Sequence, residues 1–87
     1  MIDPSAVTIR LSEQGFRLLR EVLEKRAPEF LSIFREDLQV NIRREQRRQL
    51  QELIGDELID TGLQENDEPN ARGLDLENLI DALSPYK

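Results

Sequence analysis

Four arginines close together in the middle of the chain are the side chains best suited to bind a ligand. On a helix they form two pairs one turn apart and cover one face: Arg43, Arg44, Arg47 and Arg48. Like charges at this spacing cost a helix roughly 0.2–0.5 kcal/mol per pair, and guanidinium groups bind carboxylates and phosphates. Three interpretations stay open: a solvated face, a dock for carboxylates of this chain or of a second copy, and a site for phosphate or nucleic acid.

The second charged region is the acidic carboxyl-terminal part of the chain. Residues 1–50 carry ten basic and eight acidic side chains, whereas residues 51–87 carry two basic and ten acidic ones. A negative field of this kind speeds association with a basic protein and repels nucleic acid. Besides the four arginines, the candidate partner-binding residues are Glu57, Asp60, Glu65 and Asp67.

The side chains that most often carry catalysis and metal binding are missing. The chain has 87 residues and contains neither His nor Cys, which removes the commonest general base and the thiolate nucleophile. There is no Gly-rich phosphate loop, and the acidic residues around Gly62 and Gly73 lack the spacing of a calcium loop. We therefore expect a protein that is not an enzyme and has no catalytic residues, no metal and no cofactor.

Helices are the elements expected to position these charges. The fold class predicted is all-α, with three to four helices over about residues 12–26, 28–42, 43–61 and 74–83. Ser12 is a typical N-cap, and Pro28 interrupts the first helix. Gly62 stands where a left-handed glycine often ends a helix.

The middle of the chain allows two interpretations, because no proline follows Pro28 before Thr61. Residues 28–61 form either one long helix or two helices with a break near residues 39–41. On a helical wheel the apolar residues of the two halves point roughly 130° apart, which indicates two packing partners. The core is expected to comprise Phe16, Leu19, Leu23, Phe34, Leu38, Leu53, Ile54, Leu58, Leu79, Ile80 and Leu83.

The amino-terminal residues 7–11 alternate apolar and polar side chains, which predicts a short strand. A helical turn or two is the alternative, because Asp3 and Pro4 form a good helix start. A lone strand in a helical chain has nothing to pair with. We therefore expect it to pair with the same segment of a second copy or with a sheet edge of a partner.

The run from Val7 to Gly15, followed by Leu18 and Leu19, resembles the passage from the wing strand to the final helix in winged-helix transcription regulators. The resemblance covers about a fifth of the chain. It implies a strand followed by a capped helix. It carries over no DNA-contacting residue, because that family places its recognition helix upstream of this passage.

Taken together, the sequence predicts one small helical domain over residues 1–87. Its expected function is that of a non-enzymatic, acidic protein-interaction module. Such a module binds or inhibits a basic protein, as immunity proteins and antitoxins do, or is a small homo-oligomeric accessory subunit. The alternative is a nucleic-acid-associated regulator that uses the basic face from Arg43 to Arg48. No apolar run is long enough to span a membrane, so we expect a cytoplasmic protein.

Overall fold

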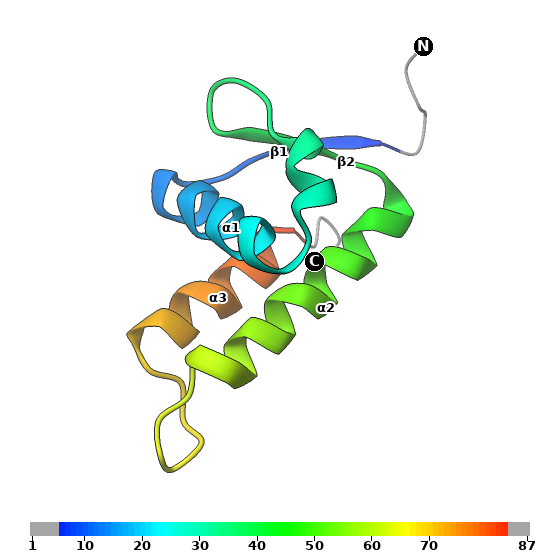
Figure 1. Ribbon diagram of the computed structural model, residues 1–87. Helices are drawn as coiled ribbons and strands as arrows, with labels where there is room; N and C mark the ends of the chain where they lie inside the picture. The colour runs from blue at the N-terminus through cyan, green and yellow to red at the C-terminus, as the bar shows by residue number, and fades with distance from the viewer. Residues whose placement is uncertain (1–5, 84–87) are drawn as a thin grey trace.

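The computed structural model describes residues 6–83 and is mostly helical. Within this range lie three α-helices, one 3-10 helix and a two-stranded sheet (Figure 1). The order along the chain is β1 (Val7–Arg10), α1 (Glu13–Arg26), η1 (Pro28–Ile33), β2 (Gln39–Ile42), α2 (Arg44–Thr61) and α3 (Ala71–Ala82). The mainly helical class is confirmed, with a small sheet added.

The sheet corrects two predictions. Strand β1 pairs antiparallel with β2 of the same chain, from Val7 opposite Ile42 to Arg10 opposite Gln39. The strand at residues 7–11 is therefore confirmed for Val7–Arg10, but it does not lack a partner within the chain. The helix predicted over residues 28–42 is wrong, and so is one long helix over 28–61. The reason is the alternation of side chains in β2. In a strand, Val40 and Ile42 lie on the same face, and both are buried. In a helix, the two side chains would point about 200° apart.

A 3-10 helix and a tight turn replace the predicted helix. Pro28 occupies the first turn of η1, as its fixed φ allows. After η1, Asp37 and Leu38 adopt φ of 59° and 61°, and the Gln39 amide donates to the Glu36 carbonyl at 3.2 Å. These are the features of the primed turns that join β-hairpins. Leu38, expected in the core, is only partly buried in this turn.

The other helix boundaries follow from capping. Helix α1 begins after Ser12, as predicted, and the Ser12 hydroxyl accepts from the Gly15 amide at 3.0 Å. Helix α3 begins at Ala71 rather than 74, because the Asn70 side chain caps it by accepting from the Gly73 amide at 2.8 Å. The helix predicted over residues 43–61 is confirmed as α2.

Helices α2 and α3 form a hairpin, and two glycines let their backbones touch. Gly62 follows α2, but its φ is −102°, so the predicted left-handed conformation is wrong. A Cβ on Gly73 would lie 2.0 Å from the Gly62 carbonyl oxygen. The glycines are thus required by close approach of the two backbones rather than by a positive φ.

The core lies between the three α-helices, η1 and one face of the sheet. Of the predicted core residues, Leu19, Leu23, Ile54, Leu79 and Leu83 are buried, whereas Phe16, Phe34, Leu53, Leu58 and Ile80 pack against the core's edge. The buried residues that the prediction omitted are Leu11, Leu18, Val22, Ala27, Ile33, Val40, Ile42, Leu50 and Leu76. Within residues 6–83, no helix is long and apolar enough to cross a membrane.

Candidate functional site

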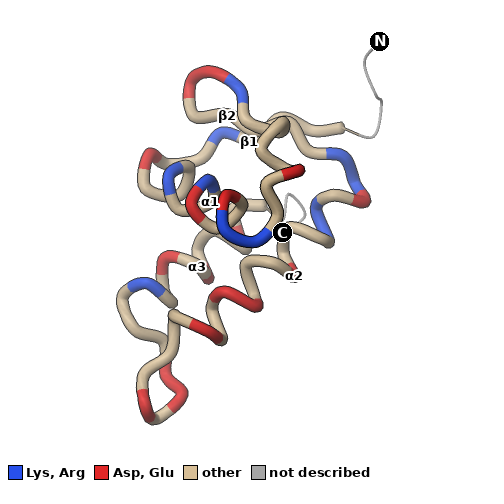
Figure 2. The backbone as a smooth tube through the Cα atoms, viewed as in Figure 1, with Lys and Arg blue, Asp and Glu red and all other residues tan. Residues whose placement is uncertain are grey.

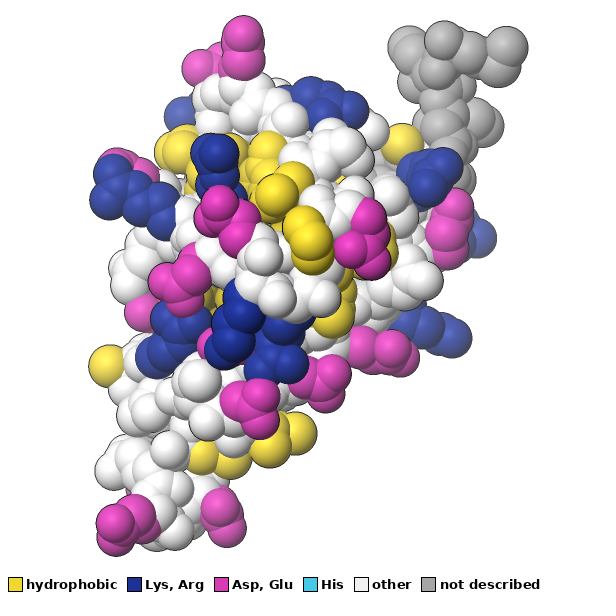
Figure 3. All heavy atoms as spheres, in the orientation of Figure 1, with side chains coloured by type: hydrophobic (Ala, Val, Ile, Leu, Met, Phe, Trp, Pro, Cys, Tyr) yellow, Lys and Arg dark blue, Asp and Glu magenta, His cyan; other side chains and the backbone are white. Residues whose placement is uncertain are grey.

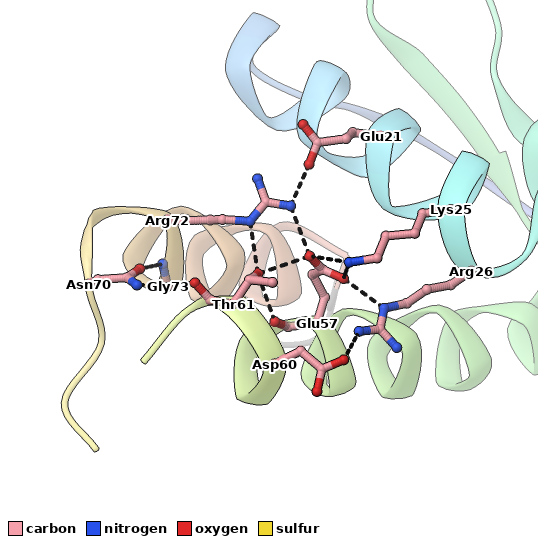
Figure 4. Close-up of polar contacts among 9 residues, drawn as sticks. All are labelled: Glu21, Lys25, Arg26, Glu57, Asp60, Thr61, Asn70, Arg72 and Gly73. Carbon is pink, nitrogen blue, oxygen red and sulfur yellow. Dashed lines mark hydrogen bonds and ion pairs between the residues drawn. The ribbon is translucent and has the colours of Figure 1, made fainter. Parts of the chain in front are cut away.

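The most distinctive polar feature of the structure is a buried carboxylate, Glu57 of α2. Leu50, Ile54 and Glu57 follow one another on the buried face of this helix, so the helical period carries the carboxylate into the interior. Its side chain is 0% exposed. Four side chains donate hydrogen bonds to it (Figure 4): Arg26 at 2.7 Å, Arg72 at 2.9 Å, Thr61 at 2.9 Å and Lys25 at 3.2 Å.

Two outer carboxylates complete this cluster. Arg72 also pairs with Glu21 of α1, and Arg26 also pairs with Asp60 of α2. We call the six charged residues and Thr61 the charge network: Glu21, Lys25, Arg26, Glu57, Asp60, Thr61 and Arg72. It joins the carboxyl end of α1 to α2 and to the start of α3. Its three cations and three carboxylates cancel, so its net charge is zero.

The electrostatics of Glu57 follow from these contacts. Burial on its own raises the pKa of this carboxyl group, but the hydrogen bonds from Arg26, Arg72, Thr61 and Lys25 outweigh burial. The resulting pKa of Glu57 is about 2, against an ordinary value of 4.5. The pKa of the Arg72 guanidinium is raised, chiefly by its hydrogen bond to Glu21 and then by that to Glu57. Glu57 is therefore ionised and fully paired at neutral pH.

Two of the predicted partner-binding residues, Glu57 and Asp60, lie in this network. Glu57 is buried, whereas the Asp60 side chain is exposed and pairs with Arg26. Their cations come from the end of α1 and the start of α3 rather than from the arginines at the start of α2. The sequence patterns do not single out Lys25, Arg26 or Arg72. The available signal is the continuation of the Leu50–Ile54 stripe into Glu57, which predicts a buried charge that needs partners.

The predicted arginine cluster lies at the amino-terminal end of α2, as the blue segments of Figure 2 show. Arg43 forms an ion pair with Glu45 at 3.5 Å. Arg44, Arg47 and Arg48 line an open hollow of about 610 Å³ together with Glu45, Gln49 and Gln51. Arg44 and Arg48 are exposed. The structure thus brings the four arginines together, away from the charge network.

The remaining predicted residues, Glu65 and Asp67, lie in the loop between α2 and α3. Glu68 follows them, and all three are exposed. None has an ion pair within residues 6–83. Leu74 follows on the first turns of α3 and is 54% exposed. We call Glu65, Asp67, Glu68 and Leu74 the acidic surface; its loop is the carboxylate-bearing end of the molecule in Figure 3.

The acidic surface is held in a defined shape by its own backbone. Leu63 and Pro69 form a β-bridge across the base of the loop. The Gln64 amide donates to the Glu68 carbonyl at 2.7 Å, and the Asp67 amide donates to the Gln64 carbonyl at 3.0 Å. These bonds define the backbone from which the three carboxylates project.

No group of three or more acidic side chains in the described part of the chain is arranged to hold a metal ion. Comparison with known proteins adds no homologue. No family model, no curated protein and no solved structure matches the chain.

Proposed function

We propose that the protein is a cytoplasmic, non-enzymatic interaction module that binds a basic protein through its acidic surface. Helix α3 and the loop before it present the carboxylates and the exposed Leu74 side chain. Basic residues of the partner would pair with the carboxylates, while an apolar group of the partner would cover Leu74.

The observation that carries this proposal is that the cations of the charge network are already paired with carboxylates. Arg72, at the start of α3, is the basic side chain nearest in sequence to the acidic loop, and it is bound to Glu57 together with Lys25 and Arg26 of α1. Because the charge network is neutral, it does not offset the charge of Glu65, Asp67 and Glu68. The hairpin therefore projects an unbalanced negative field, which attracts a basic partner.

Two further observations support a binding role over a solubilising one. The loop bonds described above order the backbone that carries the carboxylates, which reduces the backbone entropy lost on binding. Leu74 is one of two large apolar side chains that are more than half exposed within residues 6–83; the other is Ile59. An exposed apolar side chain that follows an acidic loop in the chain offers a partner an apolar contact in addition to the charges.

Neutralising the acidic surface tests the proposal. The variant E65Q/D67N/E68Q removes three charges, and Asn is suited to the left-handed backbone of Asp67, whose φ is 65°. The matched control E24Q/E29Q/E36Q removes three exposed carboxylates elsewhere. Each protein is immobilised, and the basic proteins that it captures from a cell extract are identified; one of them is then purified and titrated against all three.

The proposal predicts that the wild type and the control capture the same basic proteins and that E65Q/D67N/E68Q loses them. The titration should give a dissociation constant that rises with salt, because exposed charges are screened. If all three proteins capture the same set, the acidic surface only keeps the protein soluble.

A nucleic-acid-associated role through the arginine cluster is the second hypothesis. It is supported by the exposed Arg44 and Arg48 side chains and by the open hollow that they line with Arg47. Against it stands the formal net charge of −6. Titration into a labelled DNA duplex at low salt tests it: salt-dependent binding that R44Q/R48Q weakens would support it, and no binding at low salt would exclude it.

A further inference from the structure

The outward face of α2 has no role in the acidic surface or in the charge network. Five residues follow one another at helical spacing along it: Arg44, Arg48, Glu52, Gly55 and Ile59. At about 100° per residue they lie within roughly 40° of one line. The four side chains on this line are exposed, and Ile59, at 69%, is the more exposed of the two large apolar residues named above.

Apart from Glu45, which pairs with Arg43, the charges on and beside this face are ordered along the helix. Arg44 and Arg48 occupy its first half, whereas Glu52 and the neighbouring Asp56 occupy its second half. Figure 2 shows this change from basic to acidic along α2. None of Arg48, Glu52 and Asp56 forms an ion pair within the described residues. Two such helices placed side by side and antiparallel would set the cations of each against the carboxylates of the other.

Gly55 is the second observation. Glycine in the interior of a helix is destabilising relative to alanine. A Cβ built on Gly55 meets no atom within 4 Å, so no contact in this part of the chain explains the glycine. A residue without a side chain on an exposed helix face allows a second helix to approach closely. Such an approach would explain why a destabilising glycine occupies this position.

The shape of the molecule favours a side-by-side arrangement. Its principal extents are 48, 28 and 23 Å. For two equal dipoles the interaction falls with the cube of the separation, and an end-to-end pair is twice as favourable as an antiparallel pair at equal separation. Since side-by-side copies approach to about 28 Å instead of 48 Å, the dipole interaction favours the antiparallel pair by about two- to threefold, whereas the net charge of −6 on each copy opposes both arrangements.

We propose that the outward face of α2 binds the same face of a second copy in an antiparallel, two-fold symmetric dimer. Arg44 and Arg48 of each copy pair with Asp56 and Glu52 of the other. These pairs place the two-fold axis at residue 50, so Gly55 lies five residues from it on each copy and permits a close approach of the helices there, and Ile59 packs on the second copy at each end. An isologous contact of this kind closes on itself, so assembly stops at the dimer.

The size of the face sets the strength of the dimer. An 18-residue helix is about 27 Å long and about 10 Å wide, so the footprint is about 270 Å² per copy. A standard interface covers about 800 Å² per partner. The dimer should therefore form only at high protein concentration, and its dissociation should increase with salt.

Sedimentation equilibrium on the purified 87-residue protein tests this inference. At high micromolar concentration and low salt, the apparent mass should approach twice 10.1 kDa, and it should fall toward the monomer as salt is added. The decisive variants give the paired positions a single sign. R44E/R48E replaces the two cations with carboxylates, and E52R/D56R replaces the two carboxylates with cations; each should be monomeric alone, and an equimolar mixture should form a heterodimer.

Two further variants test the charge order and the close helix approach separately. The exchange R48E/E52R swaps two charges within the chain, keeps the face self-complementary and should still dimerise. Gly55→Gln should keep the helix, as judged by circular dichroism, and weaken the dimer at least tenfold. The acidic-surface variant E65Q/D67N/E68Q should dimerise like the wild type, so this inference and the proposed function can fail independently.

Three results would overturn the inference. The first is a wild type that remains a monomer at low salt and high concentration. The second is a mixture of R44E/R48E and E52R/D56R that remains monomeric although each variant is folded. The third is growth into species larger than the dimer, which indicates head-to-tail contact. Binding of a DNA duplex by a monomeric wild type would assign the arginines to nucleic acid instead.

Discussion

Replacing Glu57 with Gln is expected to destabilise the protein strongly and in a pH-dependent way. The change keeps the size of the side chain but removes the anion to which Lys25, Arg26 and Arg72 are bound. The variant then holds three cations around a buried neutral amide. Breaking a buried ion pair by removing one partner typically costs about 3–5 kcal/mol.

The magnitude can be worked from the pKa of Glu57. The value falls from 4.5 to about 2 in the folded protein, and each unit corresponds to about 1.36 kcal/mol. The carboxylate thus contributes about 3 kcal/mol to the free energy of unfolding at pH 7. Because the folded pKa is the lower one, this contribution is present above about pH 4.5 and is lost as the pH falls toward 2.

Urea unfolding followed by far-ultraviolet circular dichroism measures this effect, since the chain has no Trp and one Tyr. The difference between wild type and Glu57→Gln should be about 3 kcal/mol at pH 7 and should shrink toward zero near pH 2. The control Glu24→Gln, at an exposed position, should stay within about 0.5 kcal/mol of the wild type. A difference below about 1 kcal/mol at pH 7, or one that does not change with pH, would refute the reasoning.

Three other substitutions probe the fold, each measured by urea or thermal unfolding. Gly73→Ala should destabilise by about 2 kcal/mol or more, because its Cβ would meet the Gly62 carbonyl at 2.0 Å; an unchanged midpoint would contradict the close approach. Leu38→Gly should stabilise the protein by about 1 kcal/mol, since φ at this position is 61°. A loss of stability would show that the packing of the Leu38 side chain outweighs the strain of its backbone. Ser12→Ala should cost about 1 kcal/mol by removing the cap of α1, and no change would contradict that role.

The sequence predicts those elements whose signals are local. Ser12 and Pro28 define the two ends of α1, and the strand pattern of Val7–Arg10 is correct. The predicted start of α3 is three residues late because the cap is Asn70, which sits in a stretch of loop-like composition.

The prediction fails between Pro28 and Ile42 because two periodicities compete there. Phe34, Leu38 and Ile42 share a helical line, whereas Val40 and Ile42 share a strand face. The segment forms a strand because it pairs with β1 through an antiparallel hydrogen-bonded ladder within the same chain. This is a tertiary effect that local propensity does not contain.

The charge network is only partly predictable. The position of Glu57 after Leu50 and Ile54 indicates a buried acid, but the identity of its partners depends on how α1 and α3 pack on α2. Arg72 lies 15 residues from Glu57 in sequence, and Arg26 lies 31. These contacts decide which carboxylates are paired with a cation.

The most direct test of the proposed function is a titration of one purified basic protein captured by the wild type against E65Q/D67N/E68Q and E24Q/E29Q/E36Q at low and high salt. The two variants have the same net charge and differ only in where the carboxylates were removed. If the acidic surface is the binding site, the dissociation constant should rise at least tenfold for the first variant and less than twofold for the second. Equal weakening by both variants would contradict the account, because binding would then depend on net charge and not on this surface.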